Sequence, residues 1–72
     1  MNKNYLVSKM KLHGDTNAVL AKYIGLSPQR FSAKINETGG AEFTQGEIEK
    51  IRDKYQLTPD EVDAIFFAQD VS

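Results

Sequence analysis

The sequence predicts an all-α fold, a compact five-helix domain, and three observations predict it. Capping signals that mark the start of a helix occur three times, at Ser27, Thr44 and Thr58. Apolar residues recur at helical spacing after each signal. No stretch alternates apolar and polar residues with the period of two that a half-buried strand requires.

The three start signals share one design. In each, a hydroxyl residue is placed to accept a hydrogen bond from a free N–H of the first turn, and flanking apolar residues fix how the chain enters the helix. Ser27 precedes Pro28 at the first helical position, and Thr44 and Thr58 are each followed three residues later by a glutamate, as in a capping box. We therefore predict helices that begin at residues 28, 45 and 59.

The predicted helices span, in order, residues 3–12, Thr16 to Tyr23, Pro28 to Asn36, 45–55 and 59–68. Gly14 and Gly25 end the first two. The segment NETGGAE between the third and fourth is predicted to be a loop that its paired glycines leave flexible. The aromatic residues predicted to be core or half-buried supports are Tyr5, Tyr23, Phe31, Phe43 and Tyr55.

Length and composition limit the kind of protein. Seventy-two residues make one domain, residues 1–72. A chain of this size buries only about 60% of its unfolded surface, which leaves little room for a deep substrate cavity. The chain has no cysteine, which excludes disulfides and thiolate metal sites and favours the cytoplasm. No stretch resembles a membrane span or a signal peptide, so no membrane association is expected.

Charge is distributed unevenly along the chain, although its net value is −1. Residues 1–36 carry six basic side chains against Asp15 alone, a balance of +5. Residues 37–72 carry three basic against nine acidic side chains, a balance of −6. A basic first half indicates that this part of the molecule faces a polyanion or an acidic protein surface.

The second and third predicted helices carry the functional signal. Ala21, Gly25 and Phe31 have the spacing of a helix-turn-helix: a small residue at the helix crossing, a glycine for the turn, and an apolar anchor from the next helix. The run TNAVLAKYIGLSPQRFSAKIN resembles the Cro/C1-type helix-turn-helix family of bacterial and phage repressors. The matching positions are Thr16, Leu20, Ala21, Gly25, Leu26, Ser27, Phe31 and Ser32. EFTQGEIEKI also looks like the fourth helix of small phage members.

The resemblance implies that Pro28–Asn36 is a recognition helix that enters the major groove of double-stranded operator DNA. It places four residues toward base edges: Pro28, Gln29, Ser32 and Ala33. A glutamine suits an adenine edge and an alanine a thymine methyl, while Arg30 and Lys34 would contact phosphates or a guanine. Asn17, Ser27 and Thr44 are implied to contact phosphates near helix N-termini.

The chain also departs from the family pattern. Pro28 stands where many members place a polar base contact, Ala33 has no side-chain hydrogen bond to offer, and Asn17 replaces a longer Gln. These departures allow a second interpretation, in which the protein binds another protein rather than DNA. The modulator-of-repression (MOR) proteins of temperate phages share this fold and act by binding a CI-type repressor protein. Arg30 and acidic residues near Glu47 would then contact that partner, in the cytoplasm of a bacterial host.

The remaining residues indicate neither catalysis nor a cofactor. A single histidine, His13, has no second histidine or cysteine to complete a metal site, and no catalytic arrangement of side chains has support. An enzyme, a cofactor and a small-molecule substrate are therefore not expected. Ile65-Phe66-Phe67, followed by Ala68 and Val71, is apolar on more than one face, which leaves a homodimer or partner surface open. A helical adaptor that has lost DNA binding is the third alternative.

Overall fold

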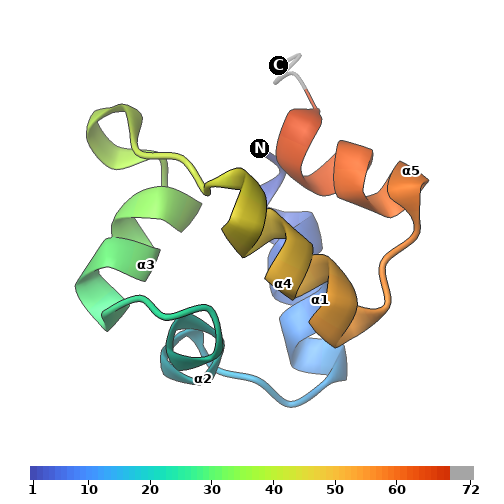
Figure 1. Ribbon diagram of the computed structural model, residues 1–72, viewed down its shortest axis with the longest axis horizontal. Coiled ribbons are helices and arrows are strands. Elements are labelled where there is room, and N and C mark those ends of the chain that lie inside the picture. Colours follow the sequence, from blue (N-terminus) through green and yellow to red (C-terminus); the bar gives the residue numbers. More distant parts are fainter. Residues whose placement is uncertain (69–72) are drawn as a thin grey trace.

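Figure 1 shows the computed structural model, which describes residues 1–68. Every element in that range is helical, and none of residues 1–68 lies in a strand. In chain order the elements are α1 (Lys3–Leu12), α2 (Asn17–Tyr23), α3 (Pro28–Ile35), the 3₁₀ turn η1 (Thr38–Gly40), α4 (Gln45–Tyr55), α5 (Pro59–Val62) and the π-helical turn η2 (Asp63–Phe67). The predicted all-α class with five α-helices is confirmed.

The predicted helix starts are also confirmed, by the hydrogen bonds that were expected. Ser27 Oγ accepts from the N–H of Arg30 at 3.3 Å. Thr44 and Thr58 each form a complete capping box with the glutamate three residues later. Two caps were not predicted: Asn2 accepts from the N–H of Tyr5 and starts α1, and Thr16 accepts from the N–H of Val19 and starts α2. Helices as short as α2 and α3 depend on these caps to satisfy N–H groups that have no partner within the helix.

The last helix differs from its prediction as a single helix over residues 59–68. α5 ends at Val62, and the chain widens into the π-helical turn η2. The wider turn puts the Ile65 side chain fully inside the core while the Ile65 carbonyl accepts from the N–H of Asn2 at 2.6 Å. Phe66 is then half-buried and Phe67 is 55% exposed. Val71, which was predicted to extend this apolar surface, lies outside the described residues.

The segment predicted to be a flexible loop between α3 and α4 contains an ordered turn. Residues Thr38–Gly40 form η1, and both glycines there have positive φ. Glu37 before it is left-handed, with φ 55°, and its carboxylate lies 3.0 Å from the α-ammonium of Met1. The turn is therefore fixed by backbone geometry and by a contact to the start of α1.

One hydrophobic core joins all five helices. Its buried members are Leu6, Met10, Leu20, Ala21, Ile24, Phe31, Ile35, Phe43, Ile48, Ile51, Tyr55, Leu57 and Ile65. Phe43 links two halves of this core, because its ring lies edge-on to Phe31 at 5.7 Å and to Phe66 at 5.9 Å. α3 is thereby packed against the segment before α4 and is linked through Phe43 to η2.

A polar cluster joins the far ends of α1 and α4. The Tyr55 hydroxyl donates to Asp15 Oδ2 at 2.8 Å, and Lys54 Nζ lies 3.4 Å from the same oxygen. The hydrogen bond from Tyr55 and the charge of Lys54 outweigh burial and hold the pKa of Asp15 below its ordinary value. Burial and the Asp15 carboxylate raise the pKa of Tyr55. Asp15 therefore stabilises the folded chain in its charged form.

Asp15→Asn is expected to lower the free energy of unfolding by about 1–2 kcal/mol at pH 7, because a hydrogen bond to a charged group is lost. A depressed carboxyl pKa stabilises the fold above the unfolded pKa of about 4 and loses that effect as pH falls. Urea unfolding of the parent protein and of the variant should be compared from pH 7 to pH 3. The difference between their free energies of unfolding should be constant above about pH 5 and should disappear below about pH 4. A gap that widens toward acid would contradict the assignment.

Candidate macromolecular interface on α3

The connection between α2 and α3 is a tight turn built by three features. Gly25 has φ +83°, a conformation that side chains resist. The N–H of Leu26 donates to the Ala21 carbonyl at 2.8 Å, which closes the end of α2. Ala21 is fully buried, as its small size at the predicted helix crossing requires. Figure 1 shows α2 viewed along its axis while α3 runs across the page beside it.

The first turn of α3 projects into solvent. Gln29 and Arg30 are both exposed, and neither side chain makes a hydrogen bond or ion pair with any residue in the range 1–68. Phe31, the next residue, is fully buried and anchors the helix from its other face. The helix thus holds two long polar side chains outward from a fixed scaffold.

The other residues of α3 that were predicted to contact bases differ in their exposure and in the polar groups that they leave free. Pro28 is exposed and Ala33 is half-buried, and neither side chain has a polar atom. Ser32 is exposed, but its hydroxyl and carbonyl both accept from the side chain of Asn36, at 3.3 and 2.9 Å. Asn36 also accepts from Lys3 Nζ at 2.5 Å. The C-terminal half of α3 is therefore largely engaged by its own protein.

Lys34 was predicted to reach into solvent toward a phosphate or a guanine, but its side chain turns to Glu47 instead. Its ammonium lies 2.7 Å from Glu47 Oε1, and each of the two side chains is only 14% exposed. The same carboxylate oxygen accepts from the N–H of Thr44 at 2.9 Å. Lys34 and Glu47 therefore tie α3 to the first turn of α4. This corrects two expectations: Lys34 as a free phosphate contact, and Glu47 as an acid open to a partner.

The local field around this pair supports the charged state of Glu47. Burial raises the pKa of the Glu47 carboxyl, but the hydrogen bonds from Lys34 and Thr44 outweigh it and hold that pKa below its ordinary value. The pair is thus internally neutral at physiological pH.

Glu47→Gln should release the Lys34 ammonium, since glutamine still completes a capping box but carries no charge. The free energy of unfolding should fall by about 1 kcal/mol in urea titrations. If α3 contacts duplex DNA, the freed Lys34 should add one phosphate contact, and the slope of log K against log salt should steepen by about 0.9. Glu49→Gln, an exposed position on the same helix, removes the same charge and serves as the control. An identical gain in both variants would contradict the specific release of Lys34.

Three predicted phosphate contacts lie at the starts of three different helices. Asn17 is exposed in the first turn of α2, and Ser27 and Thr44 are exposed caps of α3 and α4. Each cap hydroxyl already accepts an N–H of its own helix, but its hydrogen is still free to donate to an anion. All three are thus chemically able to contact a phosphate.

The basic first half of the chain is less available than its charge balance indicates. Lys9 pairs with Glu61, and Lys34 pairs with Glu47. Within residues 1–68, the basic side chains of this half with no acidic partner include Lys11, Lys22 and Arg30. Arg30 is the one that lies on α3. Fewer basic side chains are therefore available to a partner than the charge balance of residues 1–36 predicts.

Tyr23, predicted to be a core or half-buried support, lies outside the core. Tyr23 is 50% exposed, and its ring lies 4.8 Å from Lys54 Nζ. Val19, one turn earlier on α2, is 48% exposed, and Leu12 at the end of α1 is 78% exposed. Helical spacing alone did not distinguish these residues from the buried Leu20 and Ile24.

Comparison with family models, with curated proteins and with solved structures finds no match for this chain. Among residues 1–68, no group of histidine, cysteine and acidic side chains is arranged to hold a metal ion. Within the same range, no helix is both long enough and apolar enough to cross a membrane.

Proposed function

We propose that this protein is a transcriptional regulator of a phage lytic/lysogenic switch and that it binds operator DNA through a helix-turn-helix formed by α2 and α3. The observation that carries the proposal is the outward, unpartnered pair Gln29 and Arg30 at the start of a helix anchored by buried Phe31. An α-helix fits the major groove, and contacts from its N-terminal residues distinguish base pairs.

In this proposal each residue has a defined role. Gln29 pairs with an adenine edge through its amide, and Arg30 contacts a guanine or a phosphate. The exposed side of Ala33 meets a thymine methyl. Asn17, Ser27 and Thr44 donate to phosphates and fix the register of the helix on the duplex. Ser32 contributes through the hydroxyl hydrogen that its contact with Asn36 leaves free.

The scarcity of free cations predicts how the DNA complex responds to salt. With Arg30 and one or two nearby lysines on phosphates, the slope of log K against log salt should be about −2 to −3. Fluorescence anisotropy with the intergenic duplex beside the gene, repeated at several salt concentrations, measures this slope. A duplex of scrambled sequence serves as the control. Equal affinity for both duplexes, or no retention at low salt, would contradict operator binding.

A second candidate is a modulator of repression that binds a CI-type repressor protein. The observation that favours it is the internal pairing of Lys34 with Glu47, which leaves α3 with Arg30 as its one cation unpaired within residues 1–68. Arg30 would then meet an acidic group of the partner. Gel filtration with a CI-type repressor protein, taken from the adjoining gene if that gene encodes one, separates the two candidates: a modulator co-elutes with the repressor and shows no salt-dependent DNA retention alone.

A further inference from the structure

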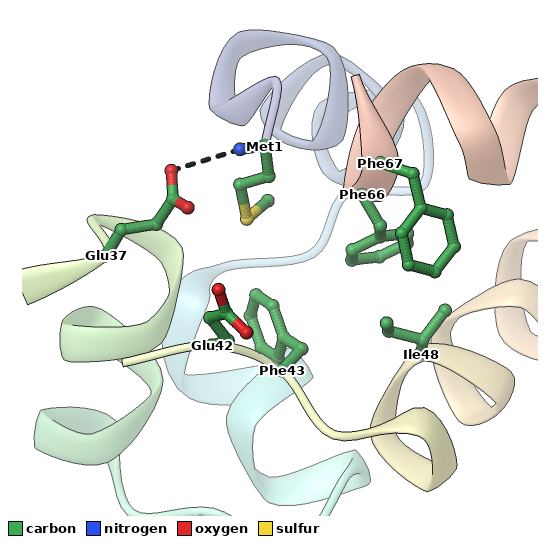
Figure 2. A pocket seen from close by; sticks show the side chains of 7 residues that line it. All are labelled: Met1, Glu37, Glu42, Phe43, Ile48, Phe66 and Phe67. Carbon is green, nitrogen blue, oxygen red and sulfur yellow. Dashed lines mark hydrogen bonds and ion pairs between the residues drawn. The ribbon is translucent and has the colours of Figure 1, made fainter. Parts of the chain in front are cut away.

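An apolar groove with an acidic rim lies between the start of α1, the segment before α4, and η2. Its volume is 110 Å³ and its lining residues are Met1, Glu37, Glu42, Phe43, Ile48, Phe66 and Phe67. Figure 2 shows the two phenylalanines of η2 facing Phe43 and Ile48 across the opening, with both glutamates on one side. We call these residues the acidic groove.

The chemistry of the acidic groove selects an apolar side chain beside a cation. Its floor is aromatic and aliphatic, and Phe67 at its mouth is 55% exposed. Glu42 forms no ion pair with any residue in the range 1–68, and Glu37 already holds one cationic group, the α-ammonium of Met1. A volume of 110 Å³ is enough for one aliphatic side chain and too small for a drug-sized ligand.

The chain carries a surface of the complementary kind, which we call the basic end: Leu12, Val19 and Tyr23 with Lys11 and Lys22. Contacts bring the ends of α1 and α2 to one corner of the molecule. The ring of His13, next to Leu12, lies 4.7 Å from Tyr55, and Lys54 Nζ lies over the rings of both Tyr55 and Tyr23. Leu12, at 78%, is the most exposed of the large apolar residues in the described range. The nearby Asp15 is neutralised by Lys54, so Lys11 and Lys22 give the basic end its positive charge.

The two surfaces lie at opposite ends of the molecule. Figure 1 shows the end of α1 and the whole of α2 at the bottom, whereas the start of α1, η2 and the connection into α4 are at the top. We propose that a second copy of this chain docks its basic end, led by Leu12, into the acidic groove. Because the two surfaces differ, the contact is head-to-tail rather than two-fold symmetric, and it propagates along a row of copies.

This association leaves open the first turn of α3, which carries the exposed Gln29 and Arg30. In Figure 1, α3 lies to the side of the line that joins the two ends, so the row leaves its first turn open. Charge complementarity supports a second copy as the occupant, since Lys11 and Lys22 of one surface meet Glu42 of the other, whereas Glu37 is already paired with the α-ammonium of Met1. The small contact area implies a weak complex that salt weakens further.

Sedimentation of the purified protein between about 10 µM and 1 mM, a range that covers weak interfaces, tests the proposal. We expect the average mass to rise with concentration at low salt, and the association constant to fall several-fold at high salt. Leu12→Gln at the basic end and Phe67→Gln at the acidic groove should each weaken association at least tenfold. Both positions are exposed, and circular dichroism checks that the variants remain folded.

Mixing the two variants gives the decisive result. One variant keeps an intact acidic groove and the other an intact basic end, so an equimolar mixture should form a heterodimer that does not grow further. Asn4→Ala, an exposed position on α1, is the control and should associate as the parent does. Three outcomes overturn the proposal: a monomer at every concentration, an Asn4→Ala effect as large as the others, or a symmetric dimer that either variant still forms alone. The first would leave the acidic groove to a different protein.

Discussion

Replacing Phe31 by Ala is expected to lower the free energy of unfolding by about 3–5 kcal/mol. Phe31 is fully buried, and its ring contacts Phe43 edge-on at 5.7 Å. The variant loses this aromatic contact and leaves a cavity where α3 meets the core. Domains of this size have only about 4–11 kcal/mol of total stability, so the substitution should remove a large part of it.

Urea unfolding followed by circular dichroism measures this effect. Phe67→Ala is the matched control, because it removes the same ring from a position that is 55% exposed. It should cost about 1 kcal/mol or less, since surface substitutions away from the core have small effects. Comparable losses in the two variants would contradict the role of Phe31 as the anchor of α3.

The second large effect concerns Arg30. Arg30→Ala is expected to weaken operator binding by about 1–3 kcal/mol, or about 5- to 150-fold, with no loss of folding stability. The side chain is exposed and has no partner within residues 1–68, so its removal costs the fold nothing. Anisotropy titrations give the change in affinity, and urea unfolding of the same sample gives the stability. Lys50→Ala, an exposed cation on α4, controls for net charge.

Gln29→Ala should behave differently from Arg30→Ala. A glutamine that pairs with an adenine edge contributes sequence preference, so its removal should reduce discrimination at one base pair while non-specific affinity stays the same. Duplexes with single base-pair changes measure this. If the two variants weaken all duplexes equally, the contact is to the backbone alone and Gln29 has no base-specific role.

The local elements were predictable because short-range chemistry determines them. A hydroxyl followed by proline or by a glutamate three residues later specifies a helix start through hydrogen bonds within a single turn, as at Ser27, Thr44 and Thr58. Gly25 takes the positive φ expected of a turn glycine. The exposure of Gln29 and Arg30 followed from their position opposite the apolar residues of α3.

What the sequence did not predict depends on contacts between distant segments. The pairing of Lys34 with Glu47 requires α3 and the start of α4 to meet, and neither residue type indicates this by itself. Tyr23 has the spacing of a core residue, but α2 is short and Leu20, Ala21 and Ile24 fill its buried face. The acidic groove combines residues from both ends of the chain, and two of them, Phe66 and Phe67, belong to η2, whose turn is wider than an α-helical one.

The central claim, that the first turn of α3 is the surface that contacts a macromolecule, is tested most directly by amide chemical-shift mapping. The ¹⁵N-labelled protein is titrated with the intergenic duplex at low salt. We predict that the largest shifts fall on Gln29, Arg30 and Ser32, with smaller ones at the starts of α2 and α4, near Asn17 and Thr44. Shifts confined to the acidic groove or the basic end, or no shifts with either this duplex or a CI-type repressor protein, would contradict the claim.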